Sequence, residues 1–178
     1  MAENVTILVD TREQAPLDIT AFPTERATLP VGDYGIAGFS DWTNPAFIIE
    51  RKSLDDLVGS LTTGRERFMR EVERLRQFRF HALVVEALEA EVSFHHYRSD
   101  ATPQSILQSL AALQVRCDLH VLWCADAERT ARCVERLVRQ FVRGIEKDYR
   151  LIGRACDSQL AASLEEDMAG MPGAEVCV

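Results

Sequence analysis

Strand-like and helix-like patterns alternate along this chain, and the alternation limits the possible folds more than any other sequence feature. Short apolar, β-branched runs predict strands, and apolar residues at helical spacing predict amphipathic helices. The predicted strands are 5–10, two short ones within 25–38, then 46–51, 81–86 and 120–125; the predicted helices are 66–77, one from Pro103 to about Arg116, and roughly 127–147. This order predicts an α/β architecture with a mixed sheet flanked by helices.

Composition narrows the class of protein. A chain of 178 residues suffices for one domain, and 47% hydrophobic with 27% charged residues is typical of soluble globular proteins. No apolar stretch approaches the ~20 residues of a membrane span. The first ten residues lack the basic region of a secretion signal. We therefore expect a cytoplasmic or nucleoid-associated protein with no membrane contact, whose five cysteines, none in a C-x-x-C pair, are reduced thiols.

Charge is distributed unevenly along the chain. The net charge of -8 argues against a protein that coats nucleic acid non-specifically. Two segments are nevertheless basic: residues 51–80 carry 8 basic and 5 acidic side chains, and residues 128–154 carry 8 and 4. Residues 155–178 carry five acids and no base. We expect one domain over 1–153 and an acidic, flexible tail over 154–178.

The segment FIIERKSLDDL, residues 47–57, places charges at the end of an apolar strand. Burying charges is costly, so their position calls for an explanation. Alternate strand residues share a face, so Glu50 and Lys52 point one way and Arg51 the other. A carboxylate and a lysine arranged in this way suit phosphodiester hydrolysis. The acid can hold a divalent metal, and the lysine can orient the attacking water or neutralise developing charge.

A single carboxylate holds Mg²⁺ poorly, so a second acid is needed nearby. Asp33 qualifies if its segment pairs beside residues 46–51, and Asp10 ends the first predicted strand. Other interpretations stay open. Glu50 and Lys52 could form an ion pair at a strand edge, and Asp33 could be a turn residue. Asp56 could either face the metal or form a capping box with Ser53.

Several short motifs occur in order with compatible spacing, namely VDTREQ, LPVGDYGI, IIERKSLDDLVGSLTTGRERFMREVERLR and HALVVE. Together they resemble the nuclease domain of the XPF/Hef structure-selective endonucleases. The matching positions are Val31–Tyr34, Glu50–Lys52 with Asp56, Gly59–Leu61, and Gly64-Arg65. The resemblance covers about residues 5–147.

That resemblance implies a restriction-endonuclease-like core and a PD-(D/E)-x-K site that uses Mg²⁺ or Mn²⁺. By position, Asp33, Glu50 and Lys52 would be catalytic, with the Arg51 main-chain carbonyl joining Asp33 and Glu50 at the metal. Asp10, Arg51 and Asp56 would assist. Arg12, Arg65 and Arg67 would contact DNA. Members of the family cut one DNA strand near branches or single-strand/double-strand junctions, which implies a role in repair or recombination.

Three functions therefore remain open: a metal-dependent DNA endonuclease, a catalytically silent DNA-binding or scaffold module, and a nuclease of another kind on the same core. The 178 residues contain nothing that reads as the helix-hairpin-helix region of many family members. Grip on branched DNA would then come from the arginine-rich segments, a homodimer or a protein partner. The last predicted helix, with its apolar stripe, is the expected dimer surface, unless the stripe is simply core.

Overall fold

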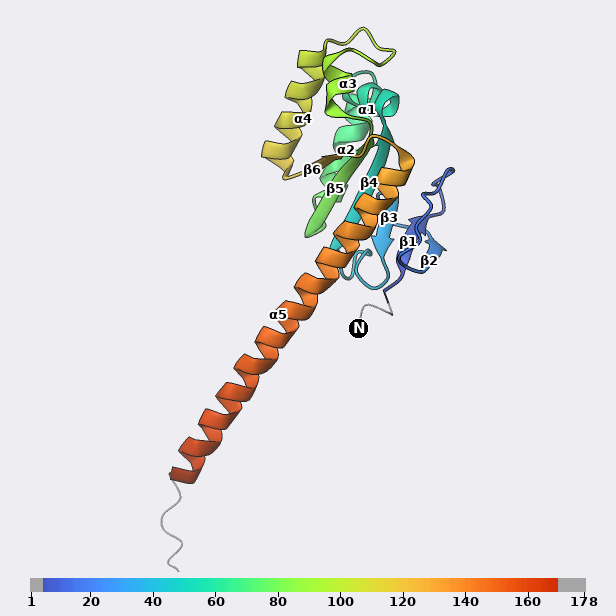
Figure 1. The fold of residues 1–178 in the computed structure, drawn as a ribbon. Helices are drawn as coiled ribbons and strands as arrows, with labels where there is room; N and C mark the ends of the chain where they lie inside the picture. Colours follow the sequence, from blue (N-terminus) through green and yellow to red (C-terminus); the bar gives the residue numbers. More distant parts are fainter. Residues whose placement is uncertain (1–4, 170–178) are drawn as a thin grey trace, which may run out of the picture. The chain divides into compact units, whose positions relative to one another are not determined.

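A six-stranded mixed sheet organises the chain in the computed structural model, which describes residues 5–169, with side chains through residue 155. The strand order is β2-β1-β3-β4-β5-β6 (Figure 1). The strands are β1 (Ile7–Asp10), β2 (Thr24–Ala27), β3 (Tyr34–Ile36), β4 (Phe47–Ser53), β5 (Phe80–Glu86) and β6 (His120–Trp123). The helices are α1 (Leu54–Leu61), α2 (Arg65–Leu75), α3 (Glu89–Ser93), α4 (Pro103–Cys117) and α5 (Ala127–Ala169). The α/β architecture expected from the sequence is confirmed.

One strand, β3, runs opposite to the other five strands of the sheet. β3 runs antiparallel to both β1 and β4, whereas β4, β5 and β6 are parallel. The parallel strands are in register, so that Lys52 is opposite Val85, which is in turn opposite Trp123. The carboxyl ends of these three strands therefore lie along one edge of the sheet. Loops at such an edge are a common location for active sites in α/β proteins.

One sheet face carries the main hydrophobic cluster. Ile48, Leu83 and Val85 pack there with apolar residues of α1, α2 and α4, which include Leu57, Val72 and Leu110. Ser53 begins α1 as its N-cap, as predicted, because its hydroxyl accepts the Asp56 amide. The cap fixes the point at which the charged end of β4 turns into a helix.

The first part of α5, up to Arg139, belongs to the same compact unit as the sheet. Val134 and Val138 have no exposed surface. The Glu135 carboxylate accepts hydrogen bonds from the backbone amides of Thr20 and Ala21, each at 2.8 Å. This part of the apolar stripe is therefore core, and the expectation that it forms a dimer surface is wrong for Val134 and Val138.

The last helix is longer than the sequence predicts. α5 continues to Ala169 instead of ending near Lys147, because no proline interrupts it before Pro172 and its glycines cost only ~1 kcal/mol each. The expected end of the folded domain at residue 153 stays a prediction, and residues 170–178 of the expected tail lie outside the described residues. α3 was not predicted, since its five residues are too few to show a helical period.

Cys117, Cys124 and Cys133 are buried free thiols, as expected; the Cys156 and Cys177 side chains lie outside the described part. Across the described residues, no helix has the length and hydropathy to span a membrane.

Gly32 provides a test of how the backbone before Asp33 is held. Its φ is +74°, and a Cβ atom there would lie 2.8 Å from Ile48 Cγ1 and 2.9 Å from the Ile49 carbonyl oxygen. Gly38 has a similar φ of +79°, but a Cβ there would meet nothing within 4 Å. We expect Gly32→Ala to lower the free energy of unfolding by ~3 kcal/mol, and Gly38→Ala by only ~1 kcal/mol. Urea denaturation of both variants measures the difference, and equal losses would contradict the predicted clash.

Candidate active site

Glu50 and Lys52 face the same side of β4, as the alternation of strand residues predicts. Lys52 Nζ donates to Glu50 Oε1 at 2.7 Å. Both side chains are nearly buried, with Glu50 only 5% exposed. They lie on the sheet face of Ile48, beneath α1 and α2, where the Lys52 ammonium is 5.2 Å from the centre of the Phe68 ring. The strand end therefore presents an acid and a base in a largely dry environment.

Asp33 reaches this site from the segment before β3. Its amide donates to the Ile49 carbonyl at 2.8 Å, and its Oδ2 accepts the Arg51 amide, also at 2.8 Å. The expectation that the Asp33 segment pairs beside β4 is thus confirmed. The two hydrogen bonds hold the Asp33 carboxylate against the last residues of β4 and leave it coupled electrostatically to Glu50.

The Arg51 side chain points away from Glu50 and Lys52. Its Nε and Nη2 donate to both carboxylate oxygens of Glu86 at 2.8 and 2.9 Å, and Nη1 donates to the Ala15 carbonyl at 2.7 Å. Nη1 is also 3.3 Å from Glu13 Oε2. The bidentate pairing with Glu86 anchors the end of β4 to β5, and the contacts of Nη1 join it to the segment after β1. Arg51 meets the site through its backbone.

The two acids have raised pKa values. Burial raises the pKa of Asp33 to about 6, against the opposing effect of the Arg51 amide. Burial, followed by the negative charge of Asp33, raises the pKa of Glu50 to about 8. Each acid is thus costly to ionise in the absence of a cation beyond Lys52.

Lys52 stays protonated in this environment. Burial would lower its pKa, but Glu50 opposes that effect through charge and a hydrogen bond, and the pKa is raised. Glu71 of α2 adds to the effect, with Oε2 3.8 Å from Lys52 Nζ. A protonated lysine can orient water and stabilise negative charge, but it cannot accept a proton.

Asp10 and Arg12 form a separate pair near these residues. Asp10 is fully buried, and its carboxylate accepts the Arg12 amide, Nε and Nη2 at 2.6–3.0 Å and the Leu29 amide at 2.7 Å. Burial would raise the pKa of Asp10, but hydrogen bonds from the Arg12 side chain and the two amides lower it. The geometry assigns this pair a structural part; the expected assistance of Asp10 and the DNA contact of Arg12 stay predictions.

Asp56, Arg65 and Arg67 lie along α1 and α2. The Asp56 carboxylate accepts the Ser53 hydroxyl at 2.7 Å, which holds it at the start of α1; the assistance of Asp56 at the metal stays a prediction. Asp56 and Arg67 also line an open, polar cavity of 360 Å³ together with Lys52 and Gly59. Arg65 donates to the Leu61 carbonyl and the Ser109 hydroxyl, both at 3.3 Å. Contact of Arg65 and Arg67 with DNA stays a prediction.

Two acids of the site were missed by reasoning from the sequence. Glu71 follows Phe68 by three residues on α2, a spacing that places it beside the apolar face and could have flagged it. Glu13 raises the pKa of Asp33 and pairs with Arg51. It lies within the VDTREQ motif, but nothing in the spacing alone brings it to β4.

Asp33 and Glu50 are the residues that could hold a divalent cation. Their oxygen ligands and raised pKa values fit such an ion, since a positive charge between them would relieve the cost of ionising both. Within the described part of the chain, no three His, Cys, Asp or Glu side chains are clustered closely enough to enclose a metal. The remaining ligands would have to be water, main-chain or substrate oxygens.

Comparison with known proteins identifies the family of this chain. The ERCC4 domain matches residues 9–137. The chain is 32% identical over 120 residues to the DNA repair endonuclease XPF of Cricetulus griseus and 33% identical over 111 residues to the DNA repair endonuclease UVH1 of Arabidopsis thaliana. These matches cover 64% and 58% of this chain but only 12% and 11% of the relatives, so the chain spans about an eighth of their length.

Solved structures agree. XPF from Aeropyrum pernix superposes with a TM-score of 0.59 at 25% identity, covering 75% of this chain and 65% of that one. Its complex with DNA superposes with a TM-score of 0.61 at 24% identity, covering 78% and 66%. The fold is therefore that of a restriction-endonuclease-like nuclease domain. The chain belongs to the ERCC4 domain family, and its domain is of the XPF type, as the motifs implied.

The raised pKa values predict how stability depends on pH in metal-free solution. The folded state keeps protons on Asp33 and Glu50 at pH values where the unfolded chain, with ordinary pKa values of 3.8 and 4.5, has released them. The free energy of unfolding should therefore fall as the pH rises from about 4.5 to about 8. Glu50→Gln removes the larger contribution, so its stability should fall less steeply over this range. Urea titrations with EDTA at several pH values test this, and an unchanged slope would contradict it.

Proposed function

We propose that this chain is a divalent-metal-dependent DNA endonuclease that hydrolyses phosphodiester bonds. The observation that carries the proposal is the pairing of the buried Glu50 and the half-buried Asp33 with a protonated lysine 2.7 Å from Glu50 at the end of β4. Similarity to two DNA repair endonucleases supports the reaction class, and the DNA-bound XPF structure supports DNA as the ligand.

Each residue has a defined part in this proposal. Asp33 and Glu50 hold Mg²⁺ or Mn²⁺, with the Arg51 main-chain carbonyl as a further ligand. The bound metal would polarise the phosphate and lower the pKa of its water. Lys52 orients the attacking water and neutralises charge that develops on the phosphate oxygens. The Arg51 amide and side chain hold Asp33 and the strand end in place.

Branched DNA is the proposed substrate, in repair or recombination. Arg67 lines the cavity beside Lys52, and Arg65 is exposed on the same helix; both would contact flanking phosphates, which fixes position without reading bases. In this proposal Arg12 would contact DNA, and Asp10 would assist the catalytic residues. Because the chain spans a small part of its relatives, a protein partner or second copy that supplies further grip on DNA also belongs to this proposal.

Loss of either catalytic group should abolish cleavage without unfolding the domain. We expect Glu50→Gln and Lys52→Ala to slow metal-dependent cutting of labelled flap, splayed-arm and four-way DNA by at least ~100-fold. Glu73→Gln is the matched control, since it removes an acid from α2 whose side chain is 54% exposed and pairs only with Arg76 among the described ion pairs. Wild-type rates in both active-site variants, with circular dichroism unchanged, would contradict the proposal.

Metal binding has its own readout. At Mg²⁺ or Mn²⁺ concentrations near 100 times Kd, the folded protein should gain about 2.7 kcal/mol of stability, and Asp33→Asn should remove the gain. Thermal unfolding with and without the ion measures this. Absence of stabilisation together with absence of cleavage would favour the silent DNA-binding module.

A further inference from the structure

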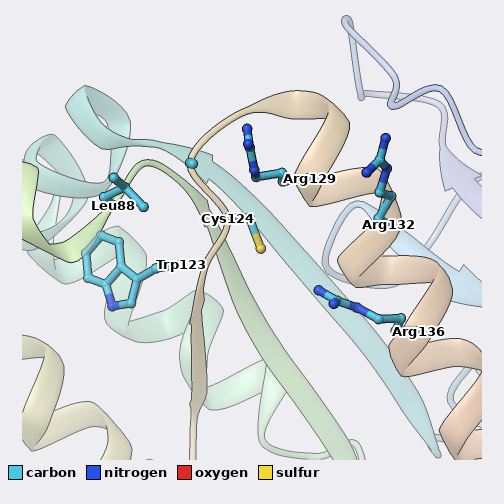
Figure 2. Close-up of a pocket in the computed structure, with 7 residues that line it drawn as sticks. Leu88, Trp123, Cys124, Arg129, Arg132 and Arg136 are labelled. Carbon is cyan, nitrogen blue, oxygen red and sulfur yellow. The ribbon is translucent and has the colours of Figure 1, made fainter.

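A second cavity opens where β6 ends and α5 begins. It has a volume of 560 Å³ and is lined by Leu88, Trp123, Cys124, Ala125, Arg129, Arg132 and Arg136. Figure 2 shows Leu88 and Trp123 on one side and the three arginines along α5 on the other, with Arg136 directed toward Cys124. None of these residues lines the cavity beside Lys52.

The cavity lies close to the candidate active site along the sheet edge. Lys52, Val85 and Trp123 are Cα partners in one row across β4, β5 and β6. Neighbouring strands are ~4.8 Å apart, so the Lys52 and Trp123 backbones are separated by about 10 Å. Trp123 also packs against the hydrophobic cluster that contains Val85 and Phe68, on the sheet face that carries Lys52. A strand held at Lys52 could therefore reach Trp123 within a few nucleotides.

The lining combines an apolar platform with positive charge. Leu88 is 52% exposed although it is large and apolar, and it lies at the same cavity as the Trp123 indole. Arg129 pairs with Asp126, and Arg132 pairs with Glu128. Both guanidinium side chains are 67% exposed, and exposed pairs of this kind are weak, so a phosphate can take over their donors. Arg136 hydrogen-bonds the Cys133 thiol.

We propose that this cavity binds an unpaired segment of the DNA strand next to the cleaved phosphodiester, with a base stacked on Trp123 and phosphates bound by Arg129, Arg132 and Arg136. The proposal rests on the proposed nuclease function and assigns an unpaired strand a binding place in the fold, the cavity on the β6 side of the site. An aromatic face beside arginines is the chemistry by which proteins hold single strands.

An unpaired strand fits better than the alternatives. In a duplex the bases are stacked on one another, so none offers a free face to an indole ring. An acidic peptide would satisfy the arginines but would leave Trp123 and Leu88 without a flat apolar partner. A short unpaired strand supplies both a ring for Trp123 and phosphates for the arginines that line the same cavity.

Tryptophan fluorescence gives a direct test. The chain has two tryptophans, and Trp42→Phe leaves Trp123 as the single reporter while keeping a ring beside Phe78. With Glu50→Gln added and EDTA present, cleavage cannot interfere. Titration with a short oligothymidylate should quench the Trp123 emission. Duplex DNA of equal length and polyglutamate should each require at least a ~10-fold higher concentration for the same quenching.

Substitutions then separate stacking from charge. Trp123→Leu should weaken binding of labelled oligothymidylate by ~5- to 150-fold, whereas Trp123→Phe, which keeps a ring and the packing, should stay within a few-fold of wild type. Arg132→Gln should reduce the slope of log K against log salt by about 0.7. Arg150→Gln is its matched control, because Arg150 lies on the same helix, is 68% exposed, pairs with Glu146 at i,i+4 and does not line the cavity.

The outcomes distinguish this inference from the proposed function. Quenching by oligothymidylate, with neither cleavage by the wild-type chain nor its stabilisation by Mg²⁺ or Mn²⁺, supports the cavity and contradicts the nuclease. Cleavage with no change in Trp123 emission, or equal binding by Trp123→Leu, overturns the cavity assignment alone. Equal or tighter quenching by duplex or by polyglutamate also overturns it, because the site would then recognise charge without an unpaired base.

Discussion

The hydrogen bond from the Arg51 amide to the Asp33 carboxylate, 2.8 Å long, joins the segment before β3 to the end of β4. The site depends on it, because β3 itself pairs with β4 only at Tyr34 and Ile49. A second bond, from the Asp33 amide to Ile49, fixes the backbone of the same residue. Gly32 permits this approach, since any side chain there would collide with Ile48. The position of the Asp33 carboxylate is thus set by main-chain hydrogen bonds and by the absence of a side chain at Gly32.

The charged end of β4 is accommodated by distributing its side chains over the two sheet faces. On one face, Arg51 is neutralised by Glu86 and Glu13. On the other, Lys52 faces Glu50 at hydrogen-bonding distance and Glu71 slightly farther away. With Asp33 included, the second face holds three acids against one base. Burial, together with the neighbouring negative charges, raises the pKa values of Asp33 and Glu50, and the excess of acids suits a cation.

Much of this could be read from residue order. Apolar runs, and the turn marked by Pro30 and Gly32, indicated the six strands, and the alternation within residues 47–52 placed Glu50 and Lys52 together and Arg51 apart. The motifs led to the family that the comparisons support. Glu13 was missed because nothing in the spacing of its segment brings it to β4, whereas the position of Glu71 beside the apolar face of α2 was a signal that the sequence did contain. The parallel pairing of β1 with β2 was equally hidden, since pairing partners depend on long-range contacts.

The sequence by itself determined the α/β class, the strand that carries the acid and the lysine, and the cap at Ser53, because periodicity and capping are local properties. Only the tertiary structure decided that the Asp10 carboxylate pairs with the Arg12 side chain and that Val134 and Val138 are core. It also decided that Trp123 is aligned with Lys52 across β4, β5 and β6. Those outcomes depend on which distant segments become neighbours. That choice is made by the packing of the whole sheet with its helices, which no local pattern encodes.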